Sequence, residues 1–101
     1  MNHIEEFQRK VAEKRRLAML CFLNEEPDRR MSVSLMGAAL ESYLLPVSRD
    51  VVTQDAEFLR GAGLVTLNHI GALPALTLTA SGVEVVRGTR RVEGIQRPPL
   101  D

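Results

Sequence analysis

The fold is decided by one stretch, LRGAGLVTLNHIGALPALTLTASGVEVVR at residues 59–87. We expect a helix to end at Gly61 or Gly63, because glycine readily adopts the left-handed turn that follows a helix C-terminus. Apolar and polar residues then alternate over Leu64–His69 and again over Ala75–Thr79, which predicts two strands. The stretch therefore begins with a helix end and continues as a short hairpin.

The hairpin is closed by residues 70–74 and leads into another helix. Thr79 or Ser81 is expected to cap that helix, since either hydroxyl can accept a hydrogen bond from a free N–H of the first turn. The helix is predicted to end near Gly88. The expected order is thus a helix, a glycine corner, two strands and a second helix.

Three helices are predicted before the hairpin. The first covers about residues 4–24 and ends before Pro27, which cannot continue a helix. The second covers about residues 34–44. The third begins after Ser48, a favourable N-cap, and its apolar residues recur at helical spacing: Val52, Ala56 and Leu59. The predicted fold class is α+β, in the order α-α-α-β-β-α with a long first helix.

Several residues carry a family resemblance across about residues 17–88. They are the cap, core, corner and strand-to-helix residues Ser48, Val52, Leu59, Gly63-Leu64-Val65 and Leu78-Thr79-Ala80-Ser81-Gly82. The chain resembles the winged helix-turn-helix domain of bacterial and phage regulators. As a whole it is similar to the small ArsR-like winged-helix proteins of Mu-like phages and prophages, a family without an established activity. We expect a domain at residues 1–88 and an irregular tail at 89–101.

The resemblance implies that the third helix is a recognition helix for duplex DNA. The residues it implies at the DNA are Ser48, Arg49, Thr53, Gln54 and Arg60, with Asp50 and Glu57 also facing outward. Two basic and three acidic residues lie within residues 48–60, a balance of −1. The predicted wing tip, from His69 to Pro74, contains no Arg or Lys. Both features favour weak DNA binding, since phosphate contacts need positive charge.

Charge over the whole chain is balanced, with 13 basic and 13 acidic residues. Positive charge collects instead on the first helix, at Arg9, Lys10, Lys14, Arg15 and Arg16, and near the C-terminus. A basic run on a helix is usually a solvated face. The alternative is a stripe that contacts phosphates.

The first helix also predicts a homodimer. At roughly 30 Å it is longer than a three-helix core can cover, so Ile4, Phe7 and Val11 are expected to form a dimer interface. The alternative is that the tail covers this stripe within one chain, through Val92, Ile95 and Leu100. Phe7, Phe22 and Phe58 are expected to be the largest side chains of the core.

Nothing in the sequence indicates an enzyme, a cofactor or a metal site. Cys21 is the only cysteine, whereas the metal sensors among ArsR-type proteins use paired cysteines. We expect a cytoplasmic protein without a membrane segment. The favoured hypothesis is a phage or prophage transcriptional regulator that binds duplex DNA. The alternatives are a protein–protein interaction module, with a phage or host partner, and a structural helper of DNA packaging.

Overall fold

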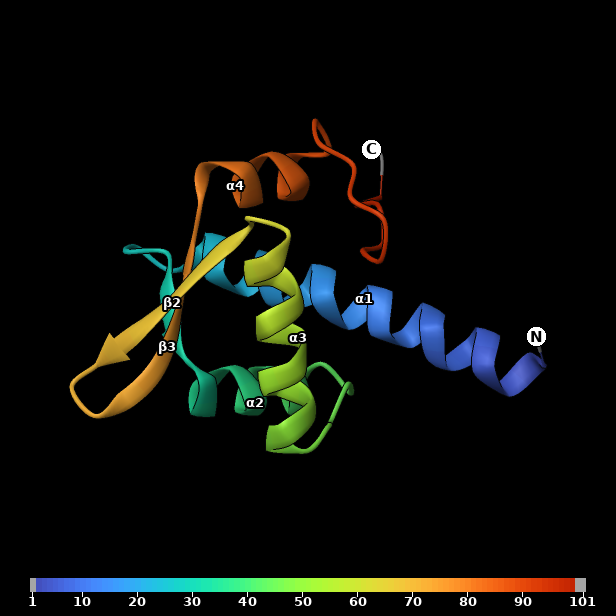
Figure 1. Cartoon of the computed structure of the whole chain (residues 1–101), viewed down its shortest axis with the longest axis horizontal. Coiled ribbons are helices and arrows are strands. Elements are labelled where there is room, and N and C mark those ends of the chain that lie inside the picture. Colours follow the sequence, from blue (N-terminus) through green and yellow to red (C-terminus); the bar gives the residue numbers. More distant parts are fainter. Residues whose placement is uncertain (1, 100–101) are drawn as a thin grey trace.

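The computed structural model describes residues 2–99 and contains four helices and a three-stranded antiparallel sheet (Figure 1). The elements are α1 (His3–Glu25), β1 (Arg30–Ser32), α2 (Val33–Ser42), α3 (Arg49–Gly61), β2 (Val65–Ile70), β3 (Leu73–Leu78) and α4 (Ala80–Arg87). This architecture agrees with the predicted α+β winged helix-turn-helix class. The predicted limits of α1 and α3 are close to the observed ones.

Helix α1 has two unlike halves. It begins at Asn2, whose Oδ1 accepts a hydrogen bond from the Glu5 N–H at 2.8 Å. In its C-terminal half, Met19, Leu20 and Leu23 are completely buried. The N-terminal half extends beyond the rest of the molecule (Figure 1). Within residues 2–99, no helix is both long enough and apolar enough to cross a bilayer.

The helix-turn-helix pair is set by two serine caps. The Ser32 hydroxyl accepts from the Leu35 N–H at 3.0 Å and begins α2, while the Ser48 hydroxyl accepts from the Val51 N–H at 3.3 Å and begins α3. These bonds satisfy N–H groups that have no partner inside the helix. The caps therefore fix where each helix starts.

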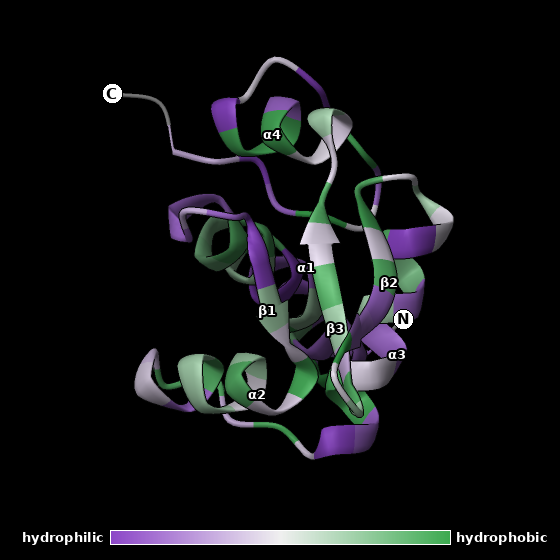
Figure 2. Ribbon diagram, turned by 90° about the vertical axis from the view of Figure 1, so that its left-hand side faces the viewer, coloured by the Kyte–Doolittle hydropathy of each residue, from purple (hydrophilic) through white to green (hydrophobic). Residues whose placement is uncertain are grey.

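The sheet is larger than predicted, because no strand was expected between the first and second helices, where β1 lies. Strand β3 lies between β1 and β2 (Figure 2), and Met31 of β1 pairs with Leu76 of β3. A three-residue strand has too few positions to show alternation. Its pairing partner also lies far away in the sequence, so no local pattern indicates it.

The wing is a tight hairpin. Ile70 pairs with Leu73, so only Gly71 and Ala72 form the turn, and Gly71 has a φ of +62°. The prediction of a five-residue tip at 70–74 was therefore too long. Positive φ is typical of two-residue hairpin turns, because it matches the twist of the two strands.

Helix α4 follows the wing directly. The Thr79 hydroxyl accepts from the Gly82 N–H at 3.1 Å, and Gly88 ends the helix in the left-handed conformation. A Cβ at Gly82 would lie 2.3 Å from the Leu64 carbonyl oxygen. Only glycine permits this close contact between α4 and the corner that precedes β2.

The core is aliphatic. Its fully buried large side chains are Met19, Leu20, Leu23, Met36, Leu40, Val52, Leu59, Leu64, Val65 and Leu76. The expectation of three phenylalanines in the core was wrong for two of them, since Phe58 is 36% exposed and Phe7 is 68% exposed, whereas Phe22 is buried. Phe7 lies on the part of α1 that no other element of the described chain covers.

Residues 89–99 pack back against the middle of α1. Ile95 is buried and Val92 is partly buried, and the Gln96 N–H donates to the Glu13 carbonyl at 3.2 Å. The tail does not reach Ile4 or Phe7, both of which stay 68% exposed. Coverage of the whole stripe by the tail is therefore contradicted for the described residues. Leu100, which was expected to take part, lies outside them.

Candidate nucleic-acid interface

Helix α3 presents one face to the core and one to solvent. Its buried residues are Val52, Asp55, Ala56 and Leu59. The six side chains predicted to point outward are all exposed: Arg49, Asp50, Thr53, Gln54, Glu57 and Arg60. The outer face of α3 is therefore polar and open to a ligand.

The first turn of α3 holds two of the predicted DNA-contacting residues. The Ser48 hydroxyl serves as the cap, which uses one of its acceptor sites and leaves its own O–H free to donate. Arg49 follows it and makes no ion pair within the described residues. Arg49 also lines a hollow of about 200 Å³ between α2 and α3, beside Glu41 and Val47.

Thr53 lies where α3 meets the wing. It lines a hollow of about 260 Å³ together with Leu67, His69 and Pro74 of the hairpin. Gln54 is exposed one position further along the helix. The middle of α3 and the wing therefore form one continuous surface.

Arg60 is held by a neighbour on its own helix. Its Nη2 and Nε donate to Glu57 Oε2 at 2.6 and 3.1 Å. Both side chains are about half exposed, and an exposed pair of this kind contributes at most about 1 kcal/mol. Arg60 can therefore leave Glu57 for a phosphate at small cost.

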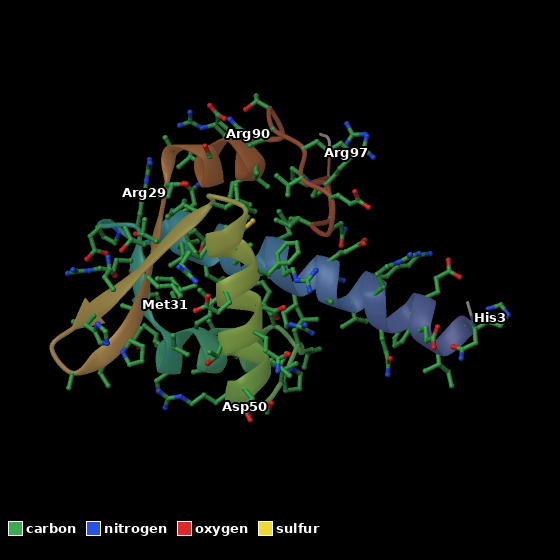
Figure 3. The ribbon with its side chains drawn as sticks, in the orientation of Figure 1. His3, Arg29, Met31, Asp50, Arg90 and Arg97 are labelled. Atoms are coloured by element: carbon green, nitrogen blue, oxygen red, sulfur yellow. The ribbon has the colours of Figure 1, made fainter. Side chains whose placement is uncertain are left out.

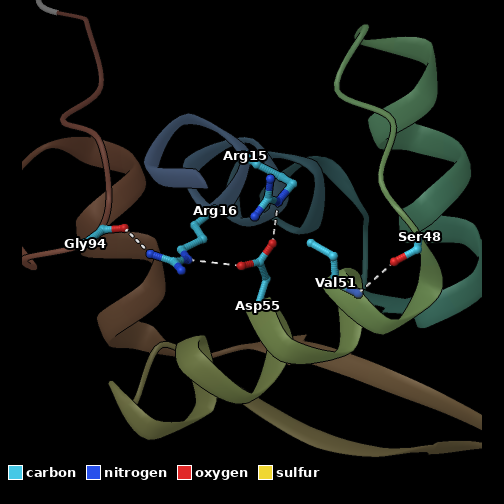
Figure 4. A network of polar contacts seen from close by, with 6 residues as sticks. All are labelled: Arg15, Arg16, Ser48, Val51, Asp55 and Gly94. Carbon is cyan, nitrogen blue, oxygen red and sulfur yellow. Dashed lines mark hydrogen bonds and ion pairs between the residues drawn. The ribbon is translucent and has the colours of Figure 1, made fainter. Parts of the chain in front are cut away.

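A buried ion-pair network joins α3 to α1 and the tail (Figure 4). Asp55 is 2% exposed, and its two carboxylate oxygens accept from Arg15 Nε and, at 3.1 Å, from Arg16 Nε. Arg16 Nη1 also donates to the Gly94 carbonyl at 2.9 Å. The Arg16 guanidinium lies 4.1 Å from the centre of the Phe58 ring. Arg16 of α1 thus contacts both α3 and the tail.

This network was missed in the sequence analysis, although a signal was present. Asp55 lies three residues after Val52 and four before Leu59, which places it on the inward face of the helix. A buried carboxylate requires a paired cation. The basic run of α1 was the available source, so Asp55 could have been matched with it.

The network changes the charge balance of the candidate interface. Without Asp55, the exposed face of α3 carries Arg49 and Arg60 against Asp50 and Glu57, which is balanced. The count of −1 overstated its acidity. Arg15 and Arg16 point inward, so the predicted stripe of five basic residues on α1 is reduced to Arg9, Lys10 and Lys14.

The positive charge near the C-terminus does not gather beside the first turn of α3. Figure 3 places Arg90 and Arg97 around α4 and the tail, at the opposite end of the molecule from Asp50 in the first turn of α3. Arg90 also pairs with Glu84 at 2.8 Å. The wing tip is apolar, with Ile70 and Leu73 38% and 51% exposed.

Within residues 2–99, no three His, Cys, Asp or Glu side chains lie close enough together to hold a metal ion. Burial, followed by the nearby Glu25 carboxylate, raises the pKa of the Cys21 thiol. A raised pKa lowers the thiolate fraction, which is the form that reacts and binds metals.

Comparison with known proteins assigns the chain to a family. No family model matches the sequence. It is 34% identical over 88 residues to the uncharacterized protein gp26 of Escherichia phage Mu, a match that covers 87% of this chain and 91% of the relative. A crystal structure described as a possible transcriptional regulator for arsenical resistance superposes with a TM-score of 0.58 and 26% identity, over 79% of this chain and 76% of that one. The chain therefore belongs to the family of the Mu phage protein gp26, and its fold is that of the ArsR-like winged-helix regulators.

Proposed function

We propose that this protein is a phage or prophage transcriptional regulator, without catalytic activity, that binds duplex DNA in the cytoplasm through the outer face of α3. The observation that carries the proposal is the exposed polar first half of α3, which presents Arg49, Thr53 and Gln54 to solvent, with Thr53 beside the wing. The match to a possible transcriptional regulator supports it.

Each residue suits a particular contact with DNA. In helix-turn-helix proteins the N-terminal residues of the recognition helix contact base edges in the major groove. Arg49 can bind guanine through two hydrogen bonds, and Gln54 can bind adenine in the same way. The free O–H of Ser48 and the Thr53 hydroxyl can donate to phosphates, where the positive end of the helix dipole adds attraction.

The charge of the surface limits the expected affinity. Arg49 and Arg60 are the two basic side chains on α3, and each phosphate contact contributes about −0.9 to the slope of log K against log salt. With Arg49 on a base, Arg60 is the basic side chain of α3 that is left for a phosphate, and one such contact gives a slope of about −1. We therefore expect weak to moderate binding with a shallow dependence on salt.

A titration with random duplex DNA at several salt concentrations tests the proposal. Arg49→Ala should weaken binding by about 1–3 kcal/mol if Arg49 contacts a base through two hydrogen bonds. Arg9→Ala is the matched control, because Arg9 is also an exposed arginine but lies on the N-terminal half of α1. Equal losses for the two variants would show that binding follows net charge and not the α3 surface.

A second function is favoured by the apolar wing tip. Ile70 and Leu73 are more suitable for a protein surface than for phosphates, which supports a role as an interaction module in phage assembly or DNA packaging with little DNA affinity. If the folded protein fails to bind duplex DNA even at low salt, this second function becomes the better explanation.

A further inference from the structure

The arginine and lysine side chains without an ion pair are unevenly distributed. In the part of the chain that the structure describes, three of them, Arg9, Lys14 and Arg49, lie on α1 and α3. The others gather at one end of the molecule, which we call the α4 end and define as Arg29, α4 and residues 88–99. They are Arg29, Arg87, Arg91 and Arg97, and all four are exposed.

Most acidic side chains without an ion pair lie away from the α4 end. Among the described residues, those on α1, its C-cap, α2 and the first turn of α3 are Glu5, Glu25, Glu26, Glu41 and Asp50. Glu13 and Glu93 are the two at the α4 end, where they line a hollow of about 650 Å³ together with Arg91 and Arg97. Glu84 is already paired with Arg90, and Asp101 lies outside the described residues. Four unpaired arginines thus stand against two unpaired glutamates.

The backbone that carries these arginines is held in place. Burial of Ile95 and the hydrogen bonds from Gln96 to Glu13 and from Arg16 to Gly94 attach the tail to α1. At the start of the tail, the Thr89 hydroxyl donates to the Glu84 carbonyl at 3.2 Å. Binding of a ligand here therefore does not have to order a flexible segment, which would cost free energy.

Arg29 is attached to the same end through the sheet. Its carbonyl accepts from the Leu78 N–H at 2.9 Å, just before α4 begins. Arg29 also has a φ of +56°, a conformation that is uncommon for residues other than glycine and is often found at functional positions. The bond to Leu78 therefore fixes Arg29 beside the start of α4.

The α4 end and the first turn of α3 lie far apart. Figure 3 shows Arg29, Arg90 and Arg97 along the upper edge of the molecule and Asp50, in the first turn of α3, at the lower edge. The molecule extends 30 Å in this direction, which is the second longest of its three dimensions. The two surfaces can therefore hold separate ligands.

We propose that the α4 end binds the phosphate backbone of duplex DNA, independently of the base sequence and separately from α3. Arginine suits this ligand, because its planar guanidinium group can donate two parallel hydrogen bonds to one phosphate. A protein partner fits less well, since protein interfaces have an apolar centre. Within residues 2–99, the large apolar side chains that are exposed all lie outside the α4 end.

The number of free arginines predicts how strongly salt weakens this binding. Each phosphate contact adds about −0.9 to the slope of log K against log salt, so four contacts give a slope of about −4. The single phosphate contact expected from α3 gives only about −1. A variant that lacks both arginines of α3, Arg49→Ala combined with Arg60→Ala, should therefore keep a steep salt dependence.

Chemical modification of arginine in the full-length protein tests where DNA binds. The protein is treated with phenylglyoxal at low salt, with and without a short duplex of random sequence, and the modified positions are identified by mass spectrometry. Arg91 and Arg97 should react several times more slowly when the duplex is present, whereas Arg9 should react equally in both cases. Arg49 reports on α3 in the same experiment, so the two surfaces are read separately.

The contribution of each arginine is then measured by substitution. In the variant without the arginines of α3, Arg91→Ala combined with Arg97→Ala should reduce the salt slope by about 2. Arg9→Ala combined with Lys10→Ala is the matched control, because it removes the same charge from the N-terminal half of α1. Replacing Arg91 and Arg97 with lysine should preserve most of the slope, since the charge remains.

Two results would overturn the proposal. One is unchanged reactivity of Arg91 and Arg97 while Arg49 becomes protected, which would leave α3 as the DNA-binding surface. The other is an equal loss of slope in the matched control, which would mean that binding follows net charge. Protection of Arg91 and Arg97 without protection of Arg49 would support the α4 end and contradict the function proposed for α3. The proposal therefore does not depend on that function.

Discussion

The two halves of α1 have similar apolar patterns and opposite surroundings. In residues 15–25, the apolar side chains Met19, Leu20 and Leu23 have no exposed surface. In residues 3–14, Ile4 and Phe7 are largely exposed. Helical periodicity identifies an apolar face but not what covers that face. The difference lies in the other elements, because α2, α4 and β3 pack against α1 and leave the N-terminal half uncovered (Figure 1).

The largest expected effect is at the boundary between the halves, where Asp55 holds Arg15 and Arg16. Asp55→Ala would leave the buried Arg15 without its carboxylate, and breaking such a pair costs about 3–5 kcal/mol of unfolding free energy. Urea denaturation measures the loss. Asp50→Ala, an exposed aspartate on the same helix, should change the stability by less than about 0.5 kcal/mol.

A pair of substitutions compares the two halves directly. Leu20→Ala should lower the unfolding free energy by about 2–5 kcal/mol, because it creates a cavity in the core. Phe7→Ala removes a larger side chain but should cost less than about 0.5 kcal/mol in dilute protein. Comparable losses in thermal unfolding would mean that the N-terminal half is covered within the monomer.

A smaller effect is expected where the tail meets this boundary. Gly94 has a φ of +92°, and a Cβ there would lie 2.6 Å from Phe58 Cζ. Gly94→Ala should therefore cost about 1–3 kcal/mol. Gly61→Ala is the control, since a Cβ at that position meets no atom within 4 Å. If Gly94→Ala leaves the unfolding free energy unchanged, the packing of the tail on α1 does not stabilise the fold. That result would favour the predicted domain limit at residue 88.

The smallest effect concerns pH and Cys21 in the C-terminal half of α1. Because burial raises its pKa in the folded protein, the unfolded chain loses the thiol proton first, from about pH 9 upward. The unfolding free energy should therefore fall as the pH rises through this region. Comparison with Cys21→Ala isolates the effect, and identical pH profiles would show that Cys21 does not contribute.

The sequence predicted the elements that are defined by local chemistry. Ser48 and Thr79 act as the expected caps, and Gly88 ends α4 as expected. It did not predict β1, whose only reason to be extended is its pairing with β3. It also placed Phe7 and Phe58 in the core, because burial depends on which elements meet in three dimensions.

The candidate site was predicted less completely. The outward residues of α3 were correctly placed, since helical periodicity alone decides which side they occupy. The partners of Asp55 were not identified, because the pairing joins residues about 40 positions apart. Two points remain predictions. One is that Arg49, Thr53 and Gln54 contact DNA. The other is that Ile4, Phe7 and Val11 contact a second copy.

The missed strand has a mechanical consequence. β1 ends at Ser32 and α2 begins at Val33, with no loop between them, and β1 is hydrogen-bonded to β3 of the wing. A force on the wing tip is therefore transmitted along β3 and across β1 into the start of α2. We therefore expect the wing and α2 to move together, because the Ser32 cap lies at the point where β1 passes into α2.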